Sequence, residues 1–226
     1  MPRETFLNLP ADKRQRIIDA AIDEFGSQPY AKATLDRIVV AAGVSKGSMY
    51  QYFEGKSDLY IWLFTDYIGR EKTAAIQDEP PGSSPSIWEV LESLYLRGMR
   101  FTVARPALAR LGFRFMRERD PDPAIRAVAE ARDAAAASFF CGLLERARAQ
   151  GEVRRDVHLD AASALLTYAL GEGMVHQIAR LQAVSIETYL ERPELLAALD
   201  EDDVLGLVRG VTDIIRYGLG TKEAER

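Results

Sequence analysis

The sequence predicts an all-α protein in which a small N-terminal module of three helices precedes a larger C-terminal helical bundle. Apolar residues recur three and four positions apart along most of the 226 residues, as they do on one face of a helix. No stretch of useful length alternates apolar and polar residues as a half-buried strand does. Prolines and glycines interrupt the helical pattern, and their densest cluster, at residues 80–85, marks the best domain boundary.

The first helix is predicted from Ile17, Ala21 and Phe25, which lie four residues apart. Pro10 stands near its start and Gly26 at its end, which is the usual asymmetry of helix boundaries. One face of this helix is therefore apolar and must be covered by the segments that follow.

Residues 34–53 are predicted to form two short helices joined by a tight turn at Gly43. Thr34 and Ser45 each stand where a hydroxyl can cap a helix N-terminus. This is the plan of a helix-turn-helix, whose second helix enters the DNA major groove. We therefore expect residues 10–56 to form a DNA-binding domain.

The rest of the chain continues the helical pattern. A linking helix is expected over about residues 57–77, and residues 78–220 are expected to form the second domain. Within it, apolar spacing and breaks predict helices from 87 to just before 106, over 108–116, from 125 to 151, over 160–174 and from about 202 to 219, with a turn at 120–123. Residues 181–199 are ambiguous, because Pro193 interrupts any helix there.

The composition is that of an ordinary globular protein, with 47% hydrophobic residues. The longest apolar runs are far too short to span a bilayer, and the N-terminus lacks the apolar core of a signal peptide. Cys141 is the single cysteine, and its neighbours predict a buried structural thiol. We expect a cytoplasmic protein that does not contact the membrane.

The net charge of −5 is not typical of a nucleic-acid-binding protein. Residues 1–56 contain 8 Lys+Arg and 7 Asp+Glu, a balance of +1, whereas the remainder contains 21 and 27, a balance of −6. Most of the acidity therefore lies outside the helix-turn-helix. DNA affinity has to come from locally placed groups, because no global positive field is available.

The predicted second helix of the motif has one apolar and one polar side. Successive residues of a helix are rotated by about 100°, and we count this rotation from Ser45. Two residues, Met49 and Phe53, then fall together on the side that packs on the first helix. Gln51 falls almost opposite. The exposed face, with its edges, therefore carries Gly47, Ser48, Tyr50, Gln51 and Tyr52.

These side chains suit a major groove. Gln51 can pair bidentately with adenine, and Gly47 lets the backbone approach the bases closely. Tyrosine hydroxyls and a helix N-terminus suit phosphate oxygens, while Lys46 and Lys56 supply positive charge. The alternative is an ordinary helical hairpin with surface aromatic residues.

The flanking residues favour the DNA-binding interpretation. The pattern consists of residues 17–21, Phe25, Thr34, Ile38, residues 42–48, Tyr50, Tyr52, Phe53, Lys56 and Leu59. In this order and spacing, the first quarter of the chain resembles the TetR family of transcriptional regulators. Val39 and Val40 depart from the family pattern, which usually has alanine and a polar residue at these positions.

The resemblance implies a ligand-responsive regulator, usually a repressor, that binds a palindromic operator as a homodimer. It implies that the C-terminal domain holds a small-molecule pocket and the dimer interface. Carried over by position, it implies phosphate contacts by Thr34, Ser45, Tyr50, Tyr52 and Lys56. Base contacts are implied for Lys46, Gly47, Ser48 and Gln51.

The C-terminal domain contains weaker signals. Helices at about 160–180 and 202–219 combine apolar stripes with small residues, which indicates either core packing or, as the resemblance favours, a dimeric four-helix bundle. Four polar residues stand in otherwise apolar surroundings and are expected in ion pairs, with a ligand anchor as the alternative for one of them: Arg100, Arg110, Arg114 and Glu172. A cavity, or simply core, could be formed by Tyr95, Phe113, Phe115, Met116, Phe139, Phe140, Tyr168, Met174 and His176.

No cofactor or metal is expected. The acidic run at residues 200–203 is better interpreted as favourable charge at a helix N-terminus, and His158 and His176 lack ligand spacing. No nucleophile elbow, phosphate-binding loop or dinucleotide turn points to an enzyme. The remaining alternative is a helical ligand-binding or scaffold protein that does not bind DNA.

Overall fold

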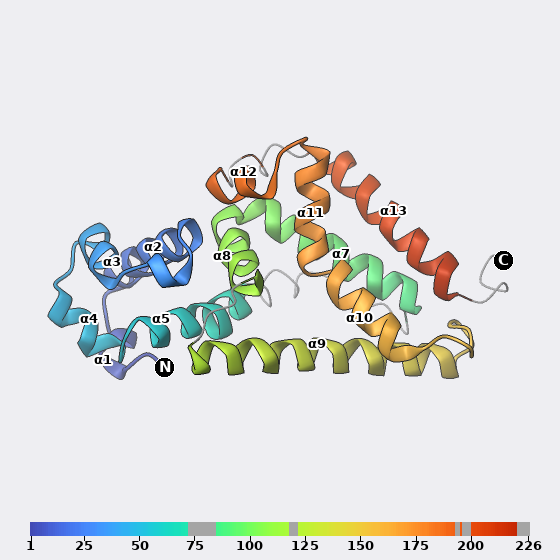
Figure 1. Cartoon of the computed structure of the whole chain (residues 1–226), viewed down its shortest axis with the longest axis horizontal. Helices are drawn as coiled ribbons and strands as arrows, with labels where there is room; N and C mark the ends of the chain where they lie inside the picture. Colours follow the sequence, from blue (N-terminus) through green and yellow to red (C-terminus); the bar gives the residue numbers. More distant parts are fainter. Residues whose placement is uncertain (72–84, 118–121, 193–194, 196–199, 221–226) are drawn as a thin grey trace.

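The structure is a computed structural model that describes residues 1–71, 85–117, 122–192, 195 and 200–220. Helices dominate these residues, and the one β-type contact among them is an isolated antiparallel bridge between Val153 and Gly220. The predicted all-α class, with a helix-turn-helix at the N-terminus and a helical C-terminal domain, is confirmed (Figure 1).

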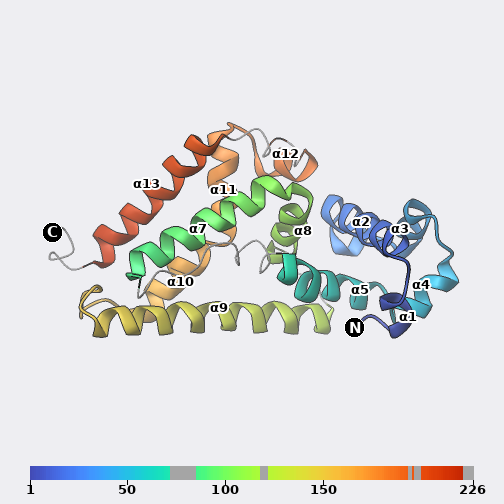
Figure 2. The same cartoon turned by 180° about the vertical axis from the view of Figure 1, so that it is seen from behind.

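The helices form two groups. The N-terminal group comprises α1 (Glu4–Leu7), α2 (Ala11–Ser27), the 3₁₀ turn η1 (Tyr30–Lys32), α3 (Leu35–Ala42), α4 (Lys46–Tyr52), α5 (Lys56–Trp62) and the π-helical turn η2 (Leu63–Ile68). The C-terminal group comprises α7 (Ile87–Ala104), α8 (Pro106–Arg117), α9 (Pro123–Ala149), α10 (Leu159–Ala169), α11 (Glu172–Leu181), α12 (Ile186–Glu191) and α13 (Glu201–Leu219). Figures 1 and 2 show α8 standing between the two groups and α9 running along one edge of the molecule.

The turn between α3 and α4 has the predicted local chemistry. The Thr34 hydroxyl accepts a hydrogen bond from the Arg37 backbone N–H at 3.3 Å, and the Ser45 hydroxyl accepts one from Ser48 N–H at 3.1 Å. Gly43 ends α3 with φ of 66°, a left-handed conformation that costs glycine little. Both predicted caps and the predicted turn are therefore confirmed.

Helix α1 packs against the end of α4, and the sequence pattern does not predict it because it is only one turn long. Phe6 is fully buried, with its ring 4.8 Å from Phe53 and 5.3 Å from Trp62. The Arg3 backbone N–H also donates to the carbonyl of Tyr52 at 2.9 Å. Since the last carbonyls of a helix lack partners within it, α1 completes the C-terminal end of α4.

The hydrophobic core of the N-terminal group continues into the second group. Leu108, Leu111 and Phe115 of α8 belong to the same buried cluster as the helix-turn-helix residues. Phe64 of η2 stacks on Phe115, with 3.7 Å between the ring centroids. The helical backbone after α5 continues to Glu71, and the rest of the predicted linking helix lies outside the described residues.

The structure corrects one prediction about the C-terminal helices and resolves part of the ambiguous stretch. The helix predicted over residues 160–174 is interrupted at Gly171, where a Cβ would lie 2.8 Å from the carbonyl oxygen of Thr167. The backbone of Gly171 lies too close to this carbonyl for a side chain to fit. The chain bends at this position, and α11 begins at Glu172. Within the ambiguous stretch, residues 186–191 form the short helix α12, and Pro193 lies outside the described residues.

The other boundaries agree better with the pattern. Asp200 caps α13, accepting a hydrogen bond from Asp203 N–H at 2.8 Å, as expected for acidic residues at a helix start. The prediction that Cys141 is buried is wrong, because this residue is half-exposed on α9. Residues 80–84 of the predicted boundary loop and 120–121 of the predicted turn lie outside the described part of the chain.

Candidate DNA-binding surface and internal cavity

Helix α4 has the predicted two-sided character. Met49 and Phe53 are fully buried against the N-terminal core. On the other side the exposed residues are Ser45, Lys46, Gly47, Tyr50 and Gln51, and Ser48 is half-exposed. The hydroxyls of Ser45 and Ser48 lie 2.8 Å apart in a hydrogen bond. The structure thus brings these predicted contact residues onto one free surface at the N-terminal end of the molecule.

Tyr52 does not belong to that surface, which corrects the prediction from helical periodicity. Its side chain is only 5% exposed, and its ring centroid lies 5.9 Å from that of Phe6. The periodicity of α4 places Tyr52 at the edge of the exposed face, but α1 covers that edge. Tyr52 therefore supports α4 from within the core.

Lys56 has a structural role that its type and position do not indicate. Its amino group donates to the carbonyl oxygens of Tyr30 at 2.8 Å and of Ala33 at 3.1 Å. It also lies 4.0 Å from the centroid of the Tyr30 ring, which is cation–π geometry. Lys56 thus holds the η1 turn against the start of α5.

Two ion pairs orient the helices of the motif. The Lys46 amino group lies 2.7 Å from a carboxylate oxygen of Asp36, and that hydrogen bond raises the pKa of Lys46. Glu24 accepts hydrogen bonds from Arg37 Nε and from Thr34 N–H, both at 2.8 Å. Burial raises the pKa of Glu24, but the hydrogen bonds from Arg37 and Thr34 outweigh it and hold the pKa below its usual range.

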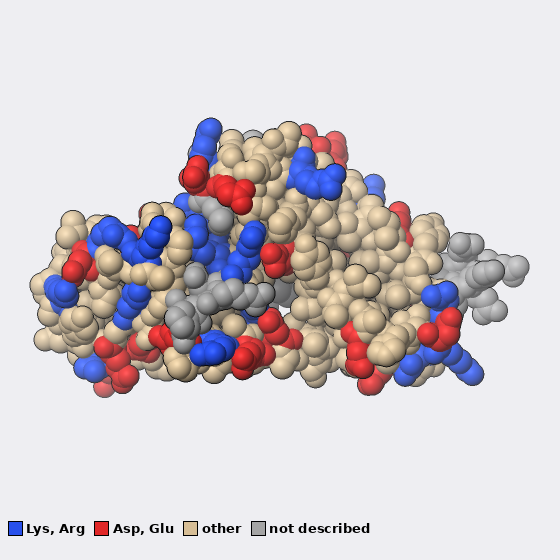
Figure 3. Space-filling view, in the orientation of Figure 1, with Lys and Arg blue, Asp and Glu red and all other residues tan. Residues whose placement is uncertain are grey.

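Positive charge is interspersed with negative charge on this end of the molecule. Figure 3 shows Lys and Arg side chains over the N-terminal group with Asp and Glu among them, and no unbroken basic face in that view. This distribution agrees with the small positive balance of residues 1–56. Any DNA contact therefore depends on individual groups at α4.

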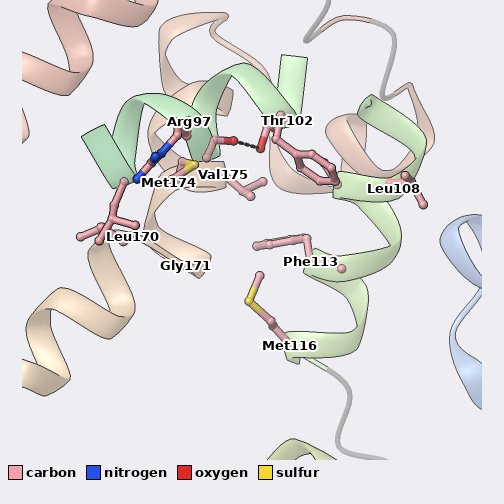
Figure 4. Close-up of a pocket in the computed structure, with 14 residues that line it drawn as sticks. Arg97, Thr102, Leu108, Phe113, Met116, Leu170, Gly171, Met174 and Val175 are labelled. Carbon is pink, nitrogen blue, oxygen red and sulfur yellow. Dashed lines mark hydrogen bonds between the residues drawn. The ribbon is translucent and has the colours of Figure 1, made fainter. Parts of the chain in front are cut away.

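A cavity of about 210 Å³ lies between α7, α8 and the α10–α11 bend. Its walls are formed by Leu94, Arg97, Gly98, Phe101, Thr102, Leu108, Ala109, Gly112, Phe113, Met116, Leu170, Gly171, Met174 and Val175. Figure 4 shows Phe113 and Met116 extending from α8 and facing Met174 and Val175. The walls are mostly apolar, as in sites for small organic molecules.

Only part of the predicted cavity lining is found there. Phe113, Met116 and Met174 line the cavity. The other predicted lining residues, which lie elsewhere, are Tyr95, Phe115, Phe139, Phe140, Tyr168 and His176. Tyr95 is fully buried beside the cavity and donates to Gln177, and burial raises its pKa.

The remaining predicted residues divide between core and surface. Phe115 and Phe140 are buried in two different hydrophobic clusters. Phe139 and Tyr168 are exposed, and His176 pairs with Glu172 at 3.5 Å. Helical periodicity identifies aromatic residues but does not distinguish which of them faces a cavity.

Among the described residues, no group of histidine, cysteine and acidic side chains is arranged to hold a metal ion. Within the same ranges, no helix is long and apolar enough to cross a membrane.

The N-terminal helices match a known family. Residues 17–61 match the family described as bacterial regulatory proteins, tetR family. A solved TetR family transcriptional regulator from Chloroflexus aurantiacus superposes with a TM-score of 0.78 and 28% identity, covering 98% of this chain and 100% of that chain. The chain therefore resembles TetR family transcriptional regulators, in sequence over its helix-turn-helix and in fold over its length.

Two further transcriptional regulators match the chain over a shorter stretch or with lower identity. The regulator SrpR of Pseudomonas putida is 48% identical over 48 residues, which is 21% of this chain and only 22% of that relative's length. The regulator FadR from Bacillus subtilis, solved in complex with stearoyl-CoA, shares the fold at 18% identity, with a TM-score of 0.65 over 90% of this chain and 98% of that chain. The match to the family model lies in the N-terminal part of the chain.

The structure also exposes an apolar face on α10 and α13. Leu165 and Tyr168 project from α10, and Ile214 and Tyr217 from α13, each with at least half of its side chain exposed. A hollow of about 340 Å³ lies between the two helices. Its lining residues are Ala162, Leu165, Leu166, Ala169, Gln177, Val211, Ile214, Ile215, Gly218 and Leu219.

Helix α8 connects the cavity to α2. Arg114 Nε donates to the carbonyl oxygen of Gly26 at 2.8 Å, and the buried Arg110 lies 3.5 Å from Asp23. The predicted ion pairing is confirmed for Arg110, whereas the Arg114 bonds to the end of α2 are not visible in the sequence. A Cβ at Gly26 would lie 2.8 Å from Arg110 Nε, so glycine also makes room for this contact.

Proposed function

We propose that this protein is a ligand-responsive transcriptional repressor that binds a palindromic operator as a homodimer. The observation that carries the proposal is the exposed face of α4, in which Gly47, Tyr50 and Gln51 are free while Met49 is fully buried. A helix presented in this way by a helix-turn-helix fits the major groove. The protein would act in the cytoplasm, where operator DNA is found.

The contacts follow from position on α4. Lys46, Gly47, Ser48 and Gln51 face the bases, and Gln51 is the side chain suited to adenine. The phosphate contacts come from Thr34, Ser45 and Tyr50. Tyr52 and Lys56 support this surface from inside the domain, because their side chains are engaged there.

The proposed roles divide between the two groups of helices. Residues 10–56 would bind DNA, about 57–77 would link, and 78–220 would bind the ligand and form the dimer. The apolar face of α10 and α13 supports dimerisation, because contiguous exposed apolar surface of this kind marks an interaction site. The two copies of α4 would then lie about 34–36 Å apart, one turn of DNA, or a multiple of it.

The cavity supports a small-molecule effector. It is enclosed by α7, α8 and α11, and α8 also contacts α2 of the DNA-binding domain. A ligand that changes the position of α8 would therefore change the position of the DNA-binding domain. The stearoyl-CoA complex of FadR, which has the same fold, supports a ligand-binding role for this half of the molecule.

Selection of genomic DNA by the purified protein, read by sequencing at a stated salt concentration, tests the proposal. We expect recovery of a short palindrome and protection of both half-sites by one dimer. Failure to recover any sequence with folded, dimeric protein would instead favour a helical ligand-binding or scaffold protein.

A further inference from the structure

We propose that the cavity between α7, α8 and α11 binds a small organic acid whose anionic group lies beside Arg97. This inference rests on the proposed function, in which the cavity holds an effector, and it specifies the chemical class of that effector. It follows from the character of the described cavity walls, the position of Arg97 among them and the volume available.

Among the described residues that line the cavity, all but Arg97 and Thr102 are apolar. Among the described residues that line it, Arg97 is the one with an ionisable side chain. The Thr102 hydroxyl donates to the Gly98 carbonyl oxygen at 2.9 Å, within α7. Figure 4 shows Arg97 extending from α7 past Met174 toward Leu170, on the far side of the cavity from Phe113 and Met116. In the described lining a ligand therefore meets the cation of Arg97 at one end and mostly hydrocarbon elsewhere.

This arrangement selects the charge of the ligand. The half-buried guanidinium lies where water is partly excluded, so its attraction for an anion is stronger than at the open surface. A guanidinium also matches a carboxylate by two parallel hydrogen bonds. A cationic ligand would be repelled by Arg97 and would find no carboxylate in the described lining.

The volume limits the size of the ligand. The cavity of about 210 Å³ is somewhat larger than the roughly 150 Å³ that accommodates benzene in an apolar protein cavity. Scaling from benzene gives roughly eight to ten non-hydrogen atoms, which corresponds to one substituted ring or a short branched chain. We therefore expect a compact monocarboxylic acid.

The surroundings of Gly112 also indicate empty volume in the cavity. Gly112 is buried in the middle of α8, yet a Cβ built on it has no heavy atom of the described residues within 4 Å. In a packed interior such a position would be in contact with neighbours. Gly112 therefore faces the empty volume, and a larger side chain there would fill the cavity without a clash at its first carbon.

Isothermal titration with three probes of nearly equal shape tests the inference. The probes are 4-methylbenzoate, the neutral 4-methylbenzamide and the cationic 4-methylbenzylamine, titrated into the full-length protein. We expect the acid to bind at least tenfold more tightly than the amide, and the amine not to bind. Equal affinities for acid and amide, stronger binding of the amine, or no binding of any probe would overturn the proposal.

Two substitutions locate the site. In Arg97→Met the affinity for the acid should fall to the affinity for the amide, while the affinity for the amide is unchanged. Arg97→Lys should keep the preference for the acid over the amide. Gly112→Leu should abolish binding of both probes while the melting temperature is kept or raised, since leucine favours helix more than glycine does. Wild-type affinity for the acid in Arg97→Met or in folded Gly112→Leu would show that the acid binds elsewhere.

These measurements contain no DNA, so they are independent of the operator experiment. Binding of the acid by a protein that selects no DNA would contradict the proposed function and leave the ligand class standing. Selection of an operator by a protein with no preference for the acid would contradict the proposed ligand class and leave DNA binding by the protein standing.

Discussion

Arg114 on α8 donates from Nε to the carbonyl oxygen of Gly26, at the C-terminal end of α2, at 2.8 Å. The Nη2 atom of Arg114 donates to the carbonyl oxygen of Ser27 at 3.4 Å. One side chain thus satisfies carbonyls that have no partner within α2. Because α8 also lines the cavity, this contact joins the proposed effector site to the DNA-binding domain.

Replacing Arg114 by methionine should therefore destabilise the protein. Hydrogen bonds from a charged donor to carbonyls contribute about 1.5–3 kcal/mol, and partial exposure of Arg114 places the expected loss near 1–2 kcal/mol of unfolding free energy. Urea denaturation measures it. Arg117→Met is the matched control on the same helix, since its exposed side chain lies 3.8 Å from Glu172 and should contribute less than about 0.5 kcal/mol. Equal losses in both variants would contradict this account.

Phe6→Ala should cost about 3–5 kcal/mol of unfolding free energy, because the ring is fully buried among Tyr52, Phe53 and Trp62. DNA affinity should fall as well, measured at a temperature where the variant is folded, because α1 supports the end of α4. Leu7→Ala is the control, with its side chain 51% exposed, and it should have little effect. Unchanged stability of Phe6→Ala would show that α1 does not contribute to the domain.

Tyr50→Phe should weaken binding to all DNA sequences by a similar factor. Its side chain is 46% exposed on α4, and the variant removes the hydroxyl proposed to contact a phosphate while it keeps the ring. The loss of one hydrogen bond corresponds to about 1 kcal/mol, or roughly fivefold in affinity. Fluorescence anisotropy with operator and with unrelated DNA measures it, and an effect confined to the operator would contradict a phosphate contact.

Gln51→Ala should instead change sequence preference. A bidentate contact to a base discriminates against the wrong base by about 1–3 kcal/mol, so discrimination at one base pair of each half-site should disappear. Binding to unrelated DNA should be unchanged. Repeating the DNA selection with the variant measures this, and an operator identical to that of the original protein would show that Gln51 does not contact a base.

Ile214→Lys should break the proposed dimer without unfolding the monomer, because the side chain is 75% exposed on α13. Light scattering should give twice the chain mass of 25.2 kDa for the original protein and a mass near one chain for the variant. Val40→Lys, also at an exposed apolar position, on α3, should remain dimeric. A monomeric original protein would refute the proposed homodimer.

Acid should destabilise the protein partly through Glu24. Its folded-state pKa lies below the ordinary value of 4.5, so the carboxylate stabilises the folded state above that value. The contribution is lost as the pH falls through the folded-state pKa. Urea denaturation between about pH 7 and pH 3 should therefore show a smaller loss of stability for Glu24→Gln than for the original protein. Identical pH profiles would contradict this role of Glu24.

Local chemistry explains which features are predictable. Capping by Thr34 and Ser45 and the left-handed Gly43 depend on residues within four positions of one another, so the sequence shows them directly. The buried face of α4 is equally visible in its periodicity. The recognition surface proposed for DNA is therefore largely predictable, apart from the side chains that distant segments engage.

Tyr52, Lys56 and the cavity illustrate what only tertiary contacts decide. Whether Tyr52 is exposed depends on α1, and what Lys56 binds depends on η1, more than twenty residues away in the chain. The cavity depends on how α7, α8 and α11 meet, so periodicity alone does not separate Phe113, which lines it, from Phe115, which packs on Phe64. Periodicity specifies which side of a helix is buried, but the partner buried against it, and any space left between them, arises only when the helices pack.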